Sequence, residues 1–179
     1  MTAYVALLRG VNVGGITIRS AELAELFRSL GFGGVRTVLA SGNVLFSTDP
    51  ESGETDAAAL KTRIESALRE RFGYDAWIIL LTEEELAAVV AAFPFDAERE
   101  GWHPYVLFAS DAAHLAELVA LAPTLDPSEE IVAAGDGVLY WQLNIAVGST
   151  NTRLAKLTAK ARFKPTTTTR NLRTLKKLL

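Results

Sequence analysis

The chain has 179 residues, of which 18 are Lys or Arg and 21 are Asp or Glu, so that its formal net charge is −3. This length allows one domain or two small ones, and the hydrophobic fraction of 49% argues against disorder. Without cysteine the chain has neither disulfide bonds nor thiolate metal sites. It also has no apolar run of about 18 residues, as a membrane span requires, and no basic segment like that of a signal peptide. We therefore expect a cytoplasmic protein that does not enter a membrane.

The first part of the sequence predicts the order β-α-β-β-α-β. An apolar run at residues 3–8 predicts a central strand. The elements expected after it are a helix at about 21–30 with Ser20 as N-cap, strands at 35–39 and 43–47, a helix from the N-cap Asp56 to Gly73, and a strand at 77–81. This is the order of the ferredoxin-like unit, whose antiparallel sheet has the strand order 4-1-3-2.

The second part of the sequence predicts the same order again. Thr82 and Glu85 have the spacing of a capping box and begin a connecting helix that ends before Pro94. The elements expected after it are a strand at 105–108, a helix capped by Ser110, strands at 130–133 and 138–142, a helix at 151–161, a short strand at 166–168 and a last helix. We therefore predict an α+β fold with a ferredoxin-like subdomain at 1–81, a helical connector at 82–101 and a second α+β subdomain at 102–179.

A turn rich in glycine follows the first strand and predicts a binding site. It contains Arg9, Gly10, Asn12, Gly14 and Gly15. Glycines let backbone N–H groups approach a ligand closely, successive N–H groups form anion-binding nests, and arginine binds an oxyanion through two parallel hydrogen bonds. The plain alternative is a tight connection between a strand and a helix, with Arg9 as a surface charge. The spacing matches neither the dinucleotide fingerprint nor the Walker A loop.

The predicted topology gives this turn a neighbour. Strands one and three are antiparallel neighbours in the order 4-1-3-2, so the end of the first strand should lie beside the start of the third. This places the turn of residues 9–15 next to Ser41, Gly42 and Asn43. The turn before the fourth strand, at residues 73–75, should lie at the same edge.

Several short motifs together resemble a known bacterial family, domain of unknown function 1697. They are Arg9-Gly10-Val11-Asn12-Val13-Gly14-Gly15, Ala21-Glu22-Leu23, Leu30-Gly31-Phe32, Val35-Arg36-Thr37, Ser41-Gly42-Asn43-Val44 and Thr169-Arg170-Asn171. The resemblance implies a small cytoplasmic protein with a ferredoxin-like part, and it brings no established activity, substrate or cofactor. The chain departs from the family in having Leu172 where a Trp is usual and Arg19-Ser20 where a Met is common. Because the shared motifs are polar and contain glycine, we add Thr169, Arg170 and Asn171 to the predicted ligand-binding residues.

The charge is unevenly distributed. Residues 1–152 have 9 basic and all 21 acidic residues, whereas residues 153–179 have 9 basic and no acidic residues. A basic face of this kind can bind nucleic-acid phosphates, although the segment can equally pack on or solubilise the acidic part. The sheet lacks the aromatic signature of the common RNA-recognition module.

Catalytic and metal motifs are weak by comparison. The two histidines, His103 and His114, have no metal-ligand spacing, and Ser41 is a nucleophile candidate without an identifiable base. We therefore expect no metal site. The sequence favours a protein that binds a small anionic or phosphorylated ligand at residues 9–15 and 41–43. The alternatives are a nucleic-acid-associated protein using the basic segment, and an enzyme acting at the same N-terminal site through oxyanion stabilisation. The sequence does not identify the ligand, a cofactor or the oligomeric state.

Overall fold

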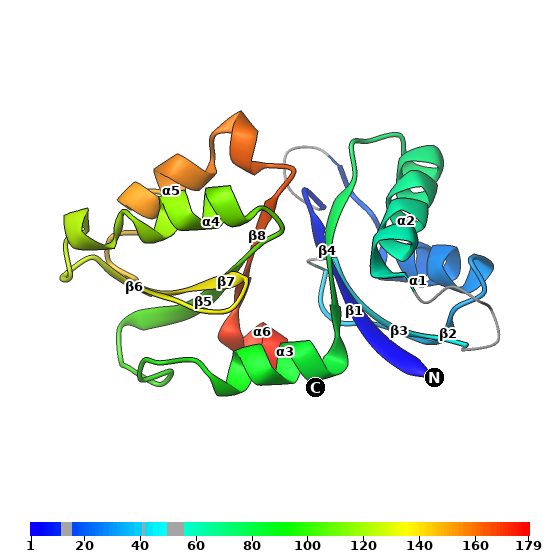
Figure 1. Cartoon of the computed structure of the whole chain (residues 1–179), viewed down its shortest axis with the longest axis horizontal. Coiled ribbons are helices and arrows are strands. Elements are labelled where there is room, and N and C mark those ends of the chain that lie inside the picture. The colour runs from blue at the N-terminus through cyan, green and yellow to red at the C-terminus, as the bar shows by residue number, and fades with distance from the viewer. Residues whose placement is uncertain (12–15, 41, 50–55) are drawn as a thin grey trace. The chain divides into compact units, whose positions relative to one another are not determined.

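A computed structural model describes residues 1–11, 16–40, 42–49 and 56–179 of the chain (Figure 1). The chain divides into two compact units. The first comprises Met1–Leu86 with Lys177–Leu179, and the second comprises Ala87–Lys176. No helix within the described ranges is both long and apolar enough to cross a membrane.

The first unit has the predicted ferredoxin-like order. Its elements are β1 (Thr2–Arg9), α1 (Ser20–Ser29), β2 (Gly33–Thr37), β3 (Asn43–Thr48), α2 (Ala57–Phe72) and β4 (Trp77–Thr82). The four strands form one antiparallel sheet in the order β2-β3-β1-β4, which confirms the predicted fold. β1 therefore lies between β3 and β4.

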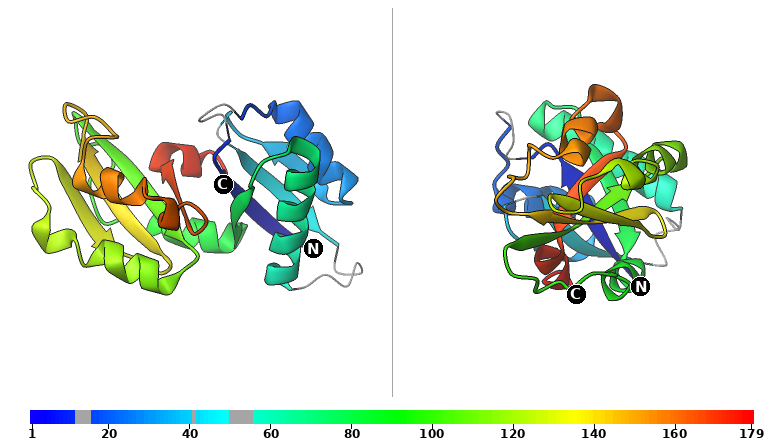
Figure 2. Two further views of the ribbon diagram at one scale, coloured as in Figure 1. Left: turned by 90° about the horizontal axis from the view of Figure 1, so that it is seen from above. Right: turned by 90° about the vertical axis from the view of Figure 1, so that its left-hand side faces the viewer.

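The core of the first unit lies between this sheet and its two helices. Figure 2 shows α1 and α2 on the same face of the sheet. Alternate residues of β1 point to that face, where Tyr4, Ala6 and Leu8 join a buried cluster with Phe27 of α1 and Ile64 of α2. The other residues of β1, Arg9 among them, point to the opposite face.

The helix caps of the first unit include one correction. Asp56 caps α2 as predicted, since its side chain accepts a hydrogen bond from Ala58 N at 3.1 Å. The N-cap of α1, however, is Arg19 and not Ser20. With Arg19 in that position Glu22 becomes the third helical residue, and its carboxylate accepts from the Arg19 backbone N–H at 3.4 Å. This capping contact between Glu22 and the N-cap residue would be lost if the helix began one residue later.

The second unit repeats the order of the first. It begins within α3 (Glu83–Ala91), which starts at the predicted capping box, with Thr82 N donating to Glu85 Oε2 at 2.8 Å. The elements after it are β5 (Trp102–Ala109), α4 (Ala112–Val119), the 3-10 helix η2 (Ala122–Thr124), β6 (Glu130–Ala134), β7 (Val138–Asn144), α5 (Arg153–Thr158), the 3-10 helix η3 (Ala161–Phe163), β8 (Thr167–Asn171) and α6 (Leu172–Lys176). Its sheet has the order β6-β7-β5-β8, which corresponds strand for strand to the first.

The core of the second unit lies under α4 and α5, which cover one face of the sheet (Figure 1). Leu107, Leu139 and Trp141 from the sheet pack with Leu118 of α4 and Leu154 of α5. The equivalent arrangement in both units confirms the predicted α+β fold with two similarly ordered halves.

Three local predictions in the second unit were wrong. The N-cap of α4 is Asp111, whose carboxylate accepts from His114 N at 2.9 Å, while the predicted cap Ser110 donates its own N–H to Thr166 O at 2.8 Å. The helix predicted at 151–161 ends at Thr158, whose hydroxyl bonds to carbonyls of its own helix and so competes with its regular hydrogen bonds. The strand predicted at 166–168 extends to Asn171, because β5 supplies pairing partners that far.

Candidate functional site

The end of β1 lies where the topology predicted, beside the starts of two other strands. Leu7 pairs with Asn43, the first residue of β3, and Arg9 pairs with Trp77, the first residue of β4. Paired residues of neighbouring strands share a face. Leu7, Arg9 and Asn43 therefore occupy one end of the sheet on the face opposite α1 and α2.

Gly42 fixes the turn before β3 against β1. Its carbonyl accepts from Leu8 N at 2.8 Å, and its φ of +72° is one that side chains rarely adopt. A Cβ added at Gly42 would lie 2.9 Å from Leu8 Cβ, closer than real Cβ atoms come. Only glycine fits here without a shift of the backbone, so the turn is held firmly against the strand.

Arg9 is half-buried at the end of β1. Burial lowers the pKa of Arg9 from its ordinary value, because removal from water disfavours the charged guanidinium. Arginine nevertheless stays protonated near neutrality. The result is a partly desolvated positive charge next to Gly10, where φ is +78°.

Asn43 has a structural role that the sequence did not reveal. Its side chain is fully buried, and its Nδ2 donates to Val38 O at 2.9 Å. The Asn43 backbone carbonyl also accepts from Val38 N at 3.0 Å. Asn43 thus closes the connection between β2 and β3, which positions the turn beside Arg9.

The remaining predicted site residues fall into two groups. Asn12, Gly14, Gly15 and Ser41 lie outside the described residues. Thr169, Arg170 and Asn171 belong to the second unit, where they lie on β8 and pair with β5.

The motif on β8 makes its own local contacts. Arg170 is nearly buried, and its Nη1 donates to Thr168 Oγ1 at 2.8 Å and to Thr169 O at 3.0 Å. The side chain of Asn171 accepts from Arg173 N at 2.9 Å at the start of α6. The sequence suggested a polar turn here, whereas Thr169, Arg170 and Asn171 form the end of a strand that leads directly into α6.

Tyr74 is a further candidate near the same end of the first sheet. It lies in the connection between α2 and β4, where the topology places it near the end of β1. Its hydroxyl is buried and has no hydrogen-bond partner among the described residues. Burial raises the pKa of Tyr74 to about 12. The position of the turn was predictable, but the buried hydroxyl depends on packing that the sequence does not show.

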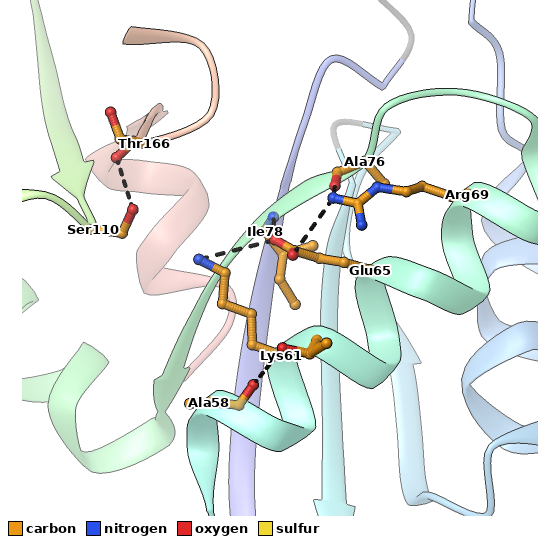
Figure 3. Close-up of polar contacts among 9 residues, drawn as sticks. Ala58, Lys61, Glu65, Arg69, Ala76, Ile78, Ser110 and Thr166 are labelled. Carbon is orange, nitrogen blue, oxygen red and sulfur yellow. Dashed lines mark hydrogen bonds and ion pairs between the residues drawn. The ribbon is translucent and has the colours of Figure 1, made fainter. Parts of the chain in front are cut away.

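A polar cluster around Glu65 joins α2 to β4 (Figure 3). Glu65 Oε1 accepts from Ile78 N at 3.0 Å, and the carboxylate lies 3.9 Å from Lys61 Nζ and 3.7 Å from Arg69 Nη2. Arg69 also donates to Ala76 O at 2.9 Å. The charged groups of this cluster pair with one another and with backbone groups at the start of β4, so the cluster holds α2 to that strand.

Hydroxyl and imidazole groups meet in the second unit. Ser110 Oγ lies 3.4 Å from Thr166 O (Figure 3), and His114 Nδ1 lies 2.8 Å from Thr166 Oγ1.

Across the described part of the chain, no group of three or more His, Asp and Glu side chains could hold a metal ion.

Comparisons with known proteins identify the family and the fold. A structure of a conserved bacterial protein from Streptococcus pneumoniae is 24% identical, has a TM-score of 0.78, and aligns over 99% of this chain and 96% of its own. At that identity the likeness shows a shared fold. No curated protein matches the chain. A family model described as "Protein of unknown function (DUF1697)" matches residues 1–140. The chain therefore belongs to that family, as its motifs indicated.

Proposed function

We propose that the chain binds a small anionic or phosphorylated ligand at the end of β1, with Arg9 as the ionic contact. The observation that carries this proposal is a half-buried guanidinium at the point where β1, β3 and β4 meet. A charge that is partly removed from water interacts more strongly with an anion than one on an open surface. Arginine also offers two parallel donors to a carboxylate or a phosphate.

The turns around Arg9 support the same proposal. Gly10 and Gly42 both have positive φ, and turns of this kind can direct backbone N–H groups at an anion. Asn43 would act mainly by holding the turn of Gly42 in place, since its amide already donates to Val38 O. Asn12, Gly14, Gly15 and Ser41 remain proposed contacts at this site. Thr169, Arg170 and Asn171 remain proposed ligand-binding residues of the second unit. We propose the cytoplasm as the place of action.

A thermal-shift screen tests this function. The probes are inorganic phosphate, nucleoside phosphates and sugar phosphates, each added to the wild-type chain. A ligand at about 100 times its Kd stabilises the folded state by about 2.7 kcal/mol, which raises the Tm by about 5–11 °C for a chain of this size.

The matched control is a second arginine in the same unit. Arg19 is 78% exposed and pairs with Glu22 on the surface. We expect Arg9→Ala to abolish the shift produced by a hit and Arg19→Ala to retain it, with circular dichroism confirming that both variants fold. A hit that shifts all three chains equally would place the ligand elsewhere.

A further inference from the structure

The basic residues of the second unit are concentrated late in the chain. No Asp or Glu occurs after Asp136, whereas nine Lys and Arg residues follow it. Five of these nine lie between Arg153 and Lys164, on α5 and η3 and at their ends. The structure separates this group into two arginines that bond to other residues of the unit and three lysines without an ion-pair partner among the described residues.

The arginines of the segment have partners. Arg162 binds the carboxylate of Glu117 on α4 through both Nη atoms. Arg153 Nη1 donates to Thr124 O at 3.3 Å. The charge of Arg162 is thus paired with a carboxylate, and Arg153 uses a donor on a backbone carbonyl, so both side chains hold the segment to the rest of the unit.

The lysines of the segment differ in this respect. Lys156, Lys160 and Lys164 are exposed, and none has a carboxylate within ion-pair distance in the ranges that the structure describes. We call these three residues the lysine edge.

The backbone that carries the lysine edge is firmly anchored. Leu154 and Phe163, which lie within the segment, are fully buried. Thr152 caps α5 by accepting from Ala155 N at 3.2 Å, and Glu130 Oε1 accepts from Leu154 N at 3.2 Å. Three positive charges are therefore presented from a fixed scaffold, which reduces the entropy lost when they bind.

We propose that the lysine edge binds the phosphate backbone of double-stranded nucleic acid, independently of sequence and of the site at the end of β1. Lysine is a compact point charge that suits phosphates. Binding to single strands needs exposed aromatic rings, but Phe163, the aromatic residue of the segment, is fully buried.

A membrane surface fits the lysine edge less well. Helices that lie in a bilayer interface bury large apolar side chains in it. The exposed large apolar residues in the described ranges are Met1, Leu39, Ile145 and Leu179, and none belongs to the segment. A phosphate backbone in water therefore fits the lysine edge better than a membrane surface does.

Salt dependence of binding to a short DNA duplex tests the proposal on the full chain. If all three lysines neutralise phosphates, the logarithm of the binding constant falls with that of the salt concentration with a slope of about −2.7, so that affinity drops about 40-fold for each fourfold rise in salt. Each single Lys→Gln variant should reduce the slope by about 0.9. The triple variant of Lys156, Lys160 and Lys164 should lose detectable binding.

The control is a triple Arg→Gln variant of Arg19, Arg28 and Arg71, which are exposed residues of the first unit. It changes the net charge equally, and we expect it to bind as wild type does. The proposal fails if low salt yields no duplex binding, or if the lysine variant binds as well as the control. It also fails if anionic vesicles or polyglutamate bind wild type as tightly as the duplex does.

Discussion

Glu130 is a buried carboxylate, and replacing it even with glutamine should destabilise the fold. It begins β6 and is 2% exposed. Its Oε2 accepts from Trp141 Nε1 at 3.0 Å, and its Oε1 accepts from Leu154 N at 3.2 Å. Both oxygens therefore face N–H donors. In Glu130→Gln one oxygen becomes an NH2 group, which cannot accept from the donor opposite it.

The cost of that change follows from the two contacts. A hydrogen bond to a charged group contributes about 1.5–3 kcal/mol, and a buried donor left without an acceptor costs about 1–3 kcal/mol. Glutamine has the same size as glutamate, so no cavity forms. We expect Glu130→Gln to lower the free energy of unfolding by about 3 kcal/mol, or the Tm by about 6–12 °C.

Urea denaturation followed by tryptophan fluorescence and circular dichroism measures this effect. Glu129→Gln is the matched control, because Glu129 is the exposed neighbour, and its effect should stay within about 0.5 kcal/mol. In a Trp141→Phe background the cost of Glu130→Gln should fall by about 1 kcal/mol or more, since one of the two donors is gone. If Glu130→Gln and Glu129→Gln have the same stability, the carboxylate does not hold β6, β7 and α5 together as described.

Two further predictions concern the end of β1 and its surroundings. Gly42→Ala should destabilise the chain by about 2–3 kcal/mol, because it adds steric overlap with Leu8 to the cost of a positive φ. Gly10 also has a positive φ, but no atom of the described residues lies within 4 Å of a Cβ added there, so Gly10→Ala should cost only about 1 kcal/mol. Equal losses in denaturation would show that the overlap does not matter. Tyr74→Phe should raise stability at neutral pH by about 1 kcal/mol, because it removes a buried hydroxyl with no partner among the described residues. Since the folded-state pKa of Tyr74 is raised to about 12 from an ordinary value of 10.0, wild type should also lose stability between those pH values as the unfolded phenol ionises first. A Tyr74→Phe chain with the same alkaline stability profile as wild type would contradict this.

The positions of the strands were largely readable from the sequence. Apolar runs and glycine-containing turns predicted the order β-α-β-β-α-β twice, and the topology of that order placed the turn of residues 9–15 beside Asn43. That inference succeeded because strand pairing depends on patterns that extend over many residues. The register Leu7 with Asn43 and Arg9 with Trp77 is its direct outcome.

Single-residue choices were less predictable. Ser20 is a better N-cap by residue type than Arg19, yet the carboxylate of Glu22 selects the earlier start. At α4 the residue after Ser110 caps the helix, because Ser110 is tied to Thr166 of the distant segment before β8. Contacts between residues far apart in the sequence decide such cases.

The chemistry of the candidate site was predictable only in part. Arg9 as a fixed cation followed from residue type and from its place after an apolar strand. The bond from Asn43 to Val38 and the desolvation of Tyr74 depend on how loops pack in three dimensions. Asn43 stays a predicted ligand contact, and the structure adds a structural hydrogen bond that its sequence context does not show.

The place of β1 between β3 and β4 affects how the chain folds. Tyr4 pairs with both Phe46 and Thr82, so β1 is synthesised before both of its partner strands and finds them far along the sequence. Sheets built from such distant pairs form slowly, whereas the hairpin of β2 and β3 is local and can form early. Until β1 inserts, that hairpin presents the unpaired edge of β3. Exposed strand edges promote association with other chains, so the first unit should be most prone to aggregation during this interval.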